Sequence, residues 1–251
     1  MIFLFLIMLP LSSLLRFSLE DGPSSFLEAV MDEDAVQAFR NSLFIAFVCT
    51  MINLISGTVL AFVLTRYRFV GRSFLKALMD LPIAIPTAVV GLALMMYYGP
   101  KGLLGPFLQD NGIEVVMAMP GVVLAHVFVT FPYTVRSVSV VLETVDRNLE
   151  DAARCLGANR AKTFLHVTLP SISSGLVAGC AMTFTRSLGE FGATLFIAGG
   201  MLTTGPLHIY ELSEARFDIQ AASSVSIVLM VFPFILLLIL NFLVQRLEVR
   251  K

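Results

Sequence analysis

Long runs of apolar side chains constrain this chain more than any other feature of its sequence. A helix needs about 20 mostly apolar residues to cross the hydrocarbon core of a bilayer. Hydrophobic residues make up 57% of the 251 residues and charged residues only 14%, against roughly 25% charged residues in a soluble domain. Because a soluble fold of this composition could not cover its surface, we expect a multi-pass membrane protein. The candidate spans are residues 1–17, 42–65, 77–98, 119–141, 171–198 and 222–245.

All six spans are expected to be α-helices, because a backbone exposed to lipid must satisfy its own hydrogen bonds. No repeat, low-complexity tract or linker divides the chain, so residues 1–251 are expected to form a single all-α transmembrane domain. Pro10 interrupts the first run, which lacks the positive region of a signal peptide. We interpret it as a first membrane helix whose true start is left open. Gly175 and Gly179 form a G-x-x-x-G pair, for which packing within the chain is favoured over a dimer contact.

Lysine and arginine residues outside the spans predict the orientation of the chain. Eleven of them fall in the loops after the second and fourth spans and in the C-terminal tail, and four fall on the opposite side. Cytoplasmic loops carry the excess of these residues, so both termini are expected in the cytoplasm. The acidic segment 20–40 is then outside, either as an amphipathic surface helix or as a solvated loop. The net charge of −1 gives no indication of a nucleic-acid partner.

A polar stretch at residues 146–170 separates the fourth and fifth spans. Its apolar and small residues recur at helical spacing on one face, namely Leu149, Ala152, Ala153 and Leu156. The expected boundaries are an N-cap at Asp146, a positive-φ turn at Gly157, an N-cap at Asn159 for a second helix to Val167, and a span starting at Pro170. A charged pair of short helices of this kind fits a docking element for a soluble partner, and it fits equally well a plain connector between spans.

This stretch resembles the cytoplasmic motif of the inner-membrane subunits of ABC importers, in which E-A-A precedes a glycine, a hydrophobe and L-P. The matching residues at that spacing are Asp151, Ala152, Ala153, Gly157, Val167, Leu169 and Pro170. Asp151 stands where the family usually has glutamate, and Glu150 comes just before it. The resemblance implies a type I ABC importer permease fold with a cytoplasmic coupling loop at about 146–170. It assigns coupling to the ATPase to Glu150, Asp151, Ala152, Ala153, Leu156, Gly157, Leu169 and Pro170.

The resemblance also implies the partners of the chain. In this family the coupling loop lies in a groove of a cytoplasmic ABC ATPase subunit, a second permease subunit completes the pathway, and an extracytoplasmic binding protein delivers the substrate. We expect the second permease to be an identical copy. The chain has no G-x-x-x-x-G-K-[ST] phosphate loop. ATP and Mg²⁺ are therefore expected on the partner ATPase, with no cofactor and no catalytic residue on this chain.

Two membrane segments narrow the substrate class. The segment "MDLPIAIPTAVVGLAL" carries Asp80, Pro82 and Pro86, and two prolines four apart bend a helix. The segment "FTRSLGEFGATLFIAGG" carries Arg186 and Glu190, four apart on one helical face. Both resemble segments of the permeases of sulfate, molybdate and tungstate importers, so these five residues are candidates for the pathway or gate. The alternatives are that the prolines only shape packing and that the Arg–Glu pair only fixes helix orientation.

The expected function is ATP-driven import of a tetrahedral oxyanion, delivered by an oxyanion-binding protein, across the cytoplasmic (inner) membrane of a prokaryote. Molybdate or tungstate is favoured, and a sulfate or thiosulfate importer is the alternative. A secondary transporter or channel that works without ATP is the alternative from another class. It would have no need of a coupling motif and would carry several buried ionisable groups. The histidines and cysteines show no spacing typical of a metal site.

Overall fold

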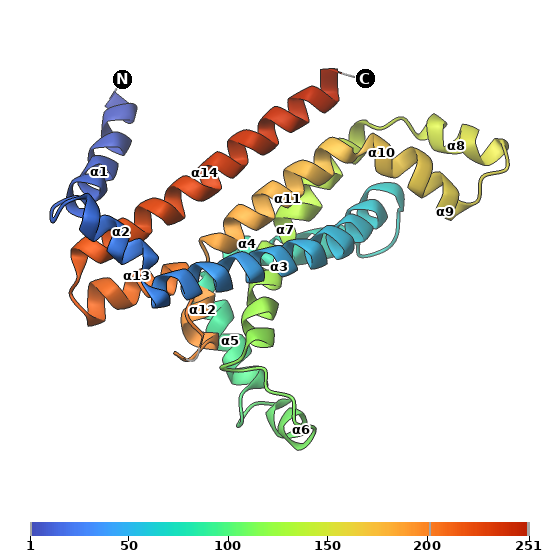
Figure 1. Ribbon diagram of the computed structural model, residues 1–251. Coiled ribbons are helices and arrows are strands. Elements are labelled where there is room, and N and C mark those ends of the chain that lie inside the picture. The colour runs from blue at the N-terminus through green and yellow to red at the C-terminus, as the bar shows by residue number, and fades with distance from the viewer. Residues whose placement is uncertain (1, 201, 250–251) are drawn as a thin grey trace.

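The computed structural model describes residues 2–200 and 202–249, which form helices and connecting loops with no strand among them (Figure 1). The expected all-α fold class is therefore confirmed. In chain order the α-helices and the two π-helices, η1 and η2, are α1 (Ile2–Ser18), α2 (Pro23–Met31), α3 (Glu33–Arg66), α4 (Arg72–Ala84), α5 (Thr87–Tyr98), α6 (Gly105–Asp110), α7 (Met119–Thr144), α8 (Arg147–Cys155), α9 (Arg160–Thr163), η1 (Phe164–Thr168), α10 (Leu169–Ser171), α11 (Ser173–Leu188), α12 (Gly192–Ile197), α13 (Gly205–Tyr210), η2 (Glu211–Ala215) and α14 (Ile219–Val249).

Helices α3, α7 and α11 pack against one another at the centre of the molecule (Figure 1). Small residues allow this close approach, as is usual where helices meet in a membrane. A Cβ added to Gly57 of α3 or Gly179 of α11 would lie 3.0 or 3.3 Å from Thr134 of α7. A Cβ on Gly175 would lie 3.0 Å from the carbonyl oxygen of Ser137, also on α7. The G-x-x-x-G pair of α11 therefore packs within the chain, as expected.

The number of continuous spans is smaller than the six expected. Among the described residues, three helices, α3, α7 and α14, are long and apolar enough to cross a membrane. Two bent helix pairs raise the number to as many as five if each pair counts as one span. Helix α1, expected to be the first span, has only 17 residues.

The expected third span is broken at a proline, as the sequence predicts. Helices α4 and α5 meet at an angle of 104°. Pro86 is the N-cap of α5, and Ile85 before it has an extended backbone with φ −92° and ψ 135°. The residue before a proline is disfavoured in the helical region, which ends α4 at this point. Pro82 lies inside α4 and is buried.

The fifth span, expected over roughly residues 171–198, is interrupted in the structure. The helix that precedes α11 meets it at 70°, with the break at Ile172. At its other end α11 stops at Leu188, and α12 starts only at Gly192. No proline marks this second break in the sequence.

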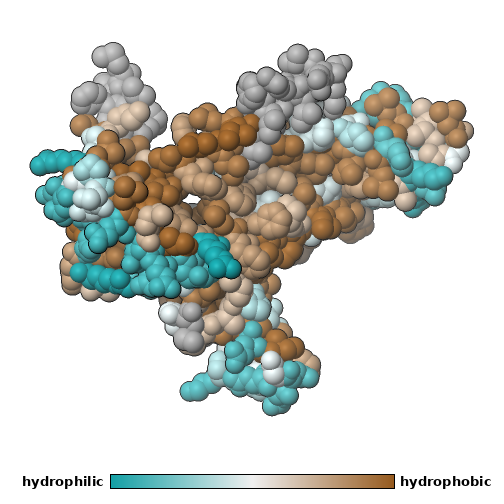
Figure 2. Space-filling view, viewed as in Figure 1, coloured by the Kyte–Doolittle hydropathy of each residue, from teal (hydrophilic) through white to brown (hydrophobic). Residues whose placement is uncertain are grey.

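Polar surface gathers at the ends of the molecule (Figure 2). Teal residues cover the region of α2 and α13, the region of α6, and the coupling loop around α8 and α9, with a mostly brown body between them.

The acidic segment 20–40 is helical: α2 covers its first part, and Asp32 caps the start of α3 by accepting the N–H of Asp34 at 3.2 Å. Its second part thus belongs to a spanning helix rather than to a surface helix.

Candidate functional site

The coupling loop, residues 146–170, has the helix–turn–helix form that its capping residues predict. Asp146 accepts the N–H of Asn148 at 2.9 Å at the start of α8, and Asn159 accepts the N–H of Lys162 at 2.9 Å at the start of α9. Gly157 has a φ of 89°. Its N–H and that of the next residue each bond to a carbonyl of α8 at 3.0 Å, which is the pairing of a Schellman motif. Local sequence signals therefore determine the shape of this loop.

Glu150 is buried in the protein rather than exposed to solvent. Its carboxylate lies 3.0 Å from the guanidinium of Arg66 at the end of α3, and the two side chains are only 4% and 7% exposed. The hydroxyl of Thr168 donates a second hydrogen bond to the same carboxylate at 3.1 Å, and Arg154 lies 3.6 Å away. Glu150 thus joins α3, α8 and the end of η1 through one buried carboxylate.

Two backbone contacts strengthen this junction. Arg66 also donates to the carbonyl of Val145 at 3.2 Å, just before α8. In the opposite direction, Arg147 of α8 donates to the carbonyl of Thr65 at 3.0 Å, near the end of α3. The last carbonyls of a helix lack intrahelical partners, and arginine side chains commonly satisfy them. Hydrogen bonds donated in both directions therefore fix the coupling loop to the end of α3.

The outer face of α8 is left exposed. Leu149 and Leu156 are 53% and 90% exposed, and Ala152 between them is exposed as well. Ala153, expected on the same face, is half-buried. Asp151 is 63% exposed and pairs with Arg154 at 3.1 Å. Apolar side chains so exposed at a polar end of the molecule mark a surface that can bind another protein.

Leu169 and Pro170 close the coupling loop in a way that differs from the prediction. Pro170 does not start the fifth span, because η1 and α10 continue the helical turn through it and the bend comes at Ile172. The π-turn bonds the N–H of Leu169 to the carbonyl of Phe164. Pro170 occupies the first turn of α10, where a missing N–H is tolerated. Leu169 packs on the core cluster that includes Ile172.

Asp80 forms an ion pair with Arg136 between α4 and α7, and two guanidinium nitrogens lie 2.9 Å from one of its carboxylate oxygens. The two side chains are 45% and 56% exposed. Asp80 thus ties α4 to α7, and Pro86, another of the residues predicted to line the pathway, lies at the break between α4 and α5. Pro82, on the same helix as Asp80, is buried in α4.

Arg186 and Glu190 form the predicted pair, with 2.6 Å between guanidinium and carboxylate, and Glu190 is 1% exposed. The second carboxylate oxygen of Glu190 accepts the N–H of Ala193 at 2.9 Å. Glu190 thus lies in the gap between α11 and α12 and caps the start of the second helix. The pair is confirmed, but it spans a helix break rather than one helical face.

His126 of α7 bridges the same break. Its two ring nitrogens lie 2.7 Å from the hydroxyl of Ser187 on α11 and 2.8 Å from the hydroxyl of Thr194 on α12. Both polar atoms of this buried ring are satisfied, as buried polar groups usually are. His126 therefore fixes the relative position of the two halves of the broken span.

The two helix breaks pack against each other. A Cβ added to Gly91 of α5 would clash with the backbone of Ala193 in α12, and one added to Gly192 would lie 2.5 Å from the hydroxyl of Thr87. Helix α12 accordingly packs on α5. The structure thus brings Pro86 and Glu190, predicted from separate segments, to neighbouring breaks. Irregular backbone inside a membrane is tolerated where protein or a cavity covers it.

Sequence reasoning missed the partners of these residues. Arg66 is separated from Glu150 by 84 positions and Arg136 from Asp80 by 56, so no local spacing connects them. The one available signal was the isolated charge of Arg136 within an apolar run, since such charges in membrane segments are usually paired. Among the described residues, no group of histidine, cysteine, aspartate or glutamate side chains could hold a metal ion.

Comparisons with known proteins agree with this architecture. Residues 39–250 match the family described as "Binding-protein-dependent transport system inner membrane component". The chain is 40% identical over 245 residues to the sulfate transport system permease protein CysT of Salmonella typhimurium, an alignment that covers 96% of this chain and 88% of the relative. It is 36% identical to a probable sulfate transport system permease protein cysT of Prototheca wickerhamii, with 94% of each chain covered.

Two solved structures share the fold. A bacterial alginate ABC transporter in complex with a periplasmic protein that holds an alginate pentasaccharide gives a TM-score of 0.79 at 17% identity, covering 98% of this chain and 89% of that chain. The MetNI methionine ABC transporter in an inward-facing form gives 0.65 at 18% identity, covering 84% and 95%. These matches show the type I importer fold alone. With the family match, they identify the chain as a member of the binding-protein-dependent transport system inner membrane components, the permease subunits of ABC importers whose ATPase is a separate subunit.

Proposed function

We propose that this chain is the permease subunit of an ABC importer for sulfate or thiosulfate. The observation that carries the proposal is 40% identity over almost the whole chain to a sulfate transport system permease. Molybdate and tungstate are favoured from the sequence alone, but the similar permeases of Salmonella typhimurium and Prototheca wickerhamii are named for sulfate, which favours the sulfate alternative. Sulfate, molybdate and tungstate are all tetrahedral dianions, so the membrane segments of their permeases share features that do not distinguish among them.

The coupling loop transmits movement from a cytoplasmic ATPase to the spans. The exposed face with Leu149, Ala152 and Leu156 contacts the ATPase, with Asp151 and Gly157 setting the charge and turn of the contact. Glu150 transmits the movement, because its buried pair with Arg66 makes the loop and α3 move as one body. Ala153, Leu169 and Pro170 hold α8 and α10 in place behind this face. ATP and Mg²⁺ are bound by the ATPase.

The substrate pathway runs beside the two packed helix breaks. Pro86 and Glu190 lie at these breaks, and Arg186, which pairs with Glu190, is 30% exposed. Asp80 and Pro82 shape α4, which leads to the first break. A pathway with few fixed cations suits transient passage, because an anion must leave as readily as it enters. A second permease subunit, expected to be an identical copy, completes the pathway, and an extracytoplasmic binding protein delivers the anion.

The coupling loop faces the cytoplasm of a prokaryote in this proposal, as do both termini. Cysteine substitutions test the orientation. Arg72→Cys and Ala161→Cys should resist an impermeant thiol reagent in intact cells, while Glu28→Cys should react. Ala161 and Glu28 are exposed, and Arg72 is half-buried. Labelling of Ala161→Cys from outside would overturn the orientation and the contact with the ATPase together.

The substrate is tested in proteoliposomes that contain the permease with its ATPase. The ATPase rate is measured against the partner binding protein loaded with sulfate, thiosulfate, molybdate, tungstate or phosphate. We expect sulfate to stimulate, because loaded and empty binding protein must differ in affinity for the two states of the permease. Phosphate should fail, because its remaining proton needs an acceptor that a site built of donors lacks.

Each alternative outcome would overturn a different part of the proposal: the choice of anion, the oxyanion class or the dependence on ATP. Stimulation by molybdate and tungstate without sulfate would restore the first expectation. Stimulation by an amino acid or a sugar, with none by the oxyanions, would overturn the oxyanion class and leave the family membership intact. Accumulation of the anion without ATP would support the secondary transporter instead.

A further inference from the structure

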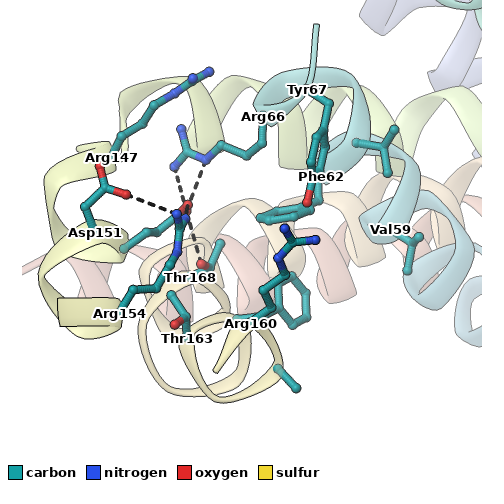
Figure 3. A pocket seen from close by; sticks show the side chains of 14 residues that line it. Val59, Phe62, Arg66, Tyr67, Arg147, Asp151, Arg154, Arg160, Thr163 and Thr168 are labelled. Carbon is teal, nitrogen blue, oxygen red and sulfur yellow. Dashed lines mark hydrogen bonds and ion pairs between the residues drawn. The ribbon is translucent and has the colours of Figure 1, made fainter. Parts of the chain in front are cut away.

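A cavity of about 580 Å³ opens between the end of α3 and the coupling loop (Figure 3). Its wall holds four arginines, Arg66, Arg147, Arg154 and Arg160, and two carboxylates, Glu150 and Asp151. The carboxylates are already occupied, since Glu150 faces Arg66 and Asp151 faces Arg154. The wall therefore carries two positive charges more than it has carboxylates to balance.

The two remaining guanidinium groups belong to Arg147 and Arg160. Arg147 donates to the carbonyl of Thr65 and forms no ion pair within residues 2–200 and 202–249. The side chain of Arg160 forms neither a hydrogen bond nor an ion pair with any described residue, although it lines the cavity (Figure 3). A guanidinium presents several N–H donors in a planar fork that matches the oxygens of a phosphate.

The floor of the cavity is apolar and continues along α3. Val59, Phe62 and Val63 line it. Val59 is 56% exposed, and Ile55 one turn before it is 71% exposed. These positions recur at helical spacing on one side of a helix that is long and apolar enough to cross a membrane. Exposed apolar side chains on such a helix face lipid, so the floor is continuous with the lipid-facing surface.

We propose that this cavity binds an anionic phospholipid from the leaflet on the side of the coupling loop. The lipid phosphate bonds to Arg147 and Arg160, and one acyl chain lies along Val59 and Ile55. Basic pockets beside membrane spans are typical sites for anionic headgroups. The bound lipid bridges the end of α3 and α9, next to the buried Glu150 junction, so it stiffens the element that transmits movement from the ATPase.

The geometry favours a lipid over a segment of the ATPase as the occupant. Of the residues assigned to the ATPase contact, Leu149, Ala152, Leu156 and Gly157 do not line the cavity, and Asp151 alone does. A soluble protein segment reaching Val59 would have to enter the apolar layer, whereas an acyl chain is already there. The excess of two positive charges further favours an anionic headgroup over a zwitterionic one.

The test uses the intact complex with its ATPase in nanodiscs of phosphatidylcholine with a minor share of phosphatidylglycerol. Native mass spectrometry counts the phosphatidylglycerol molecules that stay bound. We expect the wild type to retain phosphatidylglycerol and the double variant Arg147→Gln/Arg160→Gln to lose it, with affinity about fivefold weaker for each arginine removed. Arg68→Gln/Lys162→Gln is the matched control, because it removes the same charge from neighbouring positions that do not line the cavity.

Arg160→Gln alone provides a second variant that breaks no described contact, so it separates loss of lipid from loss of fold. A photo-crosslinking residue in place of Val59 should attach to phosphatidylglycerol. Equal lipid retention in the double variant and in the control would overturn the proposal. So would equally tight binding of soluble glycerophosphoglycerol or inorganic phosphate, which would make the cavity a plain phosphate site. Crosslinking of position 59 to the ATPase would assign the cavity to the protein interface instead.

Discussion

Two glutamates of this permease are buried beside an arginine, and they serve different parts of the molecule. Glu150 lies in the coupling loop and Glu190 in the break between α11 and α12. The partner of Glu190 is four residues away, and the rest of its carboxylate caps α12. The partner of Glu150 is 84 residues away, on another spanning helix. The Glu190–Arg186 pair therefore shapes one broken helix, and the Glu150–Arg66 pair joins two helices that must move together.

The two pairs differ in how much the loss of the carboxylate should destabilise the protein, because their arginines differ in solvent exposure. Arg66 is 7% exposed, so it is poorly hydrated if its carboxylate is lost, whereas Arg186 is 30% exposed and retains more of its hydration. Breaking a buried pair leaves an uncompensated charge, and the penalty depends on how well water can reach that charge. We therefore expect the coupling junction to be the more sensitive of the two.

Glu150→Gln should have the largest effect. It leaves the buried Arg66 without its counter-charge, which costs about 3–5 kcal/mol. Thermal unfolding of the purified complex should move to lower temperature, and transport should be lost. Asp151→Asn, at the exposed neighbouring pair, serves as the control and should lower stability by less than about 1 kcal/mol. Equal losses of thermal stability in the two variants would show that burial of Glu150 has no role.

The double variant Arg66→Met/Glu150→Leu sharpens the same test. Replacing a buried ion pair by apolar side chains of similar size is often neutral or stabilising. We expect most of the stability lost in Glu150→Gln to return. Uptake should recover with it if the junction only needs to be rigid. Uptake that stays absent in a stable double variant would show that coupling needs the polar contacts of this junction, including the hydrogen bonds from Thr168 and to Val145, and not rigidity alone.

Glu190→Gln should have an intermediate effect. The amide oxygen can still accept the N–H of Ala193, so only the ion pair with Arg186 is lost. We expect a loss of about 1–3 kcal/mol in stability, in the range for a charged hydrogen bond. The ATPase should remain bound in a pull-down, while anion uptake falls. Release of the ATPase in this variant would contradict the separation of the two glutamates.

Gly157→Val should have the smallest effect on stability and a distinct effect on coupling. Its φ of 89° is unfavourable for a branched residue by roughly 1 kcal/mol or more, and no neighbouring atom would contact an added Cβ. The shape of the exposed face should therefore change without damage to the core, and less ATPase should co-purify. Gly157→Asn is the matched control, since asparagine tolerates this conformation. Normal yields of ATPase with Gly157→Val would show that the turn is only a connector.

Local sequence signals predicted the elements that depend on neighbouring residues. The caps at Asp146 and Asn159, the turn at Gly157 and the break at Pro86 all follow from short-range backbone chemistry, and the structure has each of them. The family resemblance rested on the same residues. The break after Leu188 was missed because no proline marks it and the polar group that stabilises it, His126, comes from another helix.

The sequence by itself determined that the chain is an all-helical membrane protein with a capped polar loop, since hydropathy and capping act within a few residues along the chain. Only the tertiary structure decided that Glu150 turns inward to Arg66 while Asp151 stays exposed, and that the breaks at Pro86 and Glu190 pack together. Adjacent acidic residues have nearly the same local preference. Which of them is buried depends on which one finds a cation on a distant helix that can offset its loss of hydration.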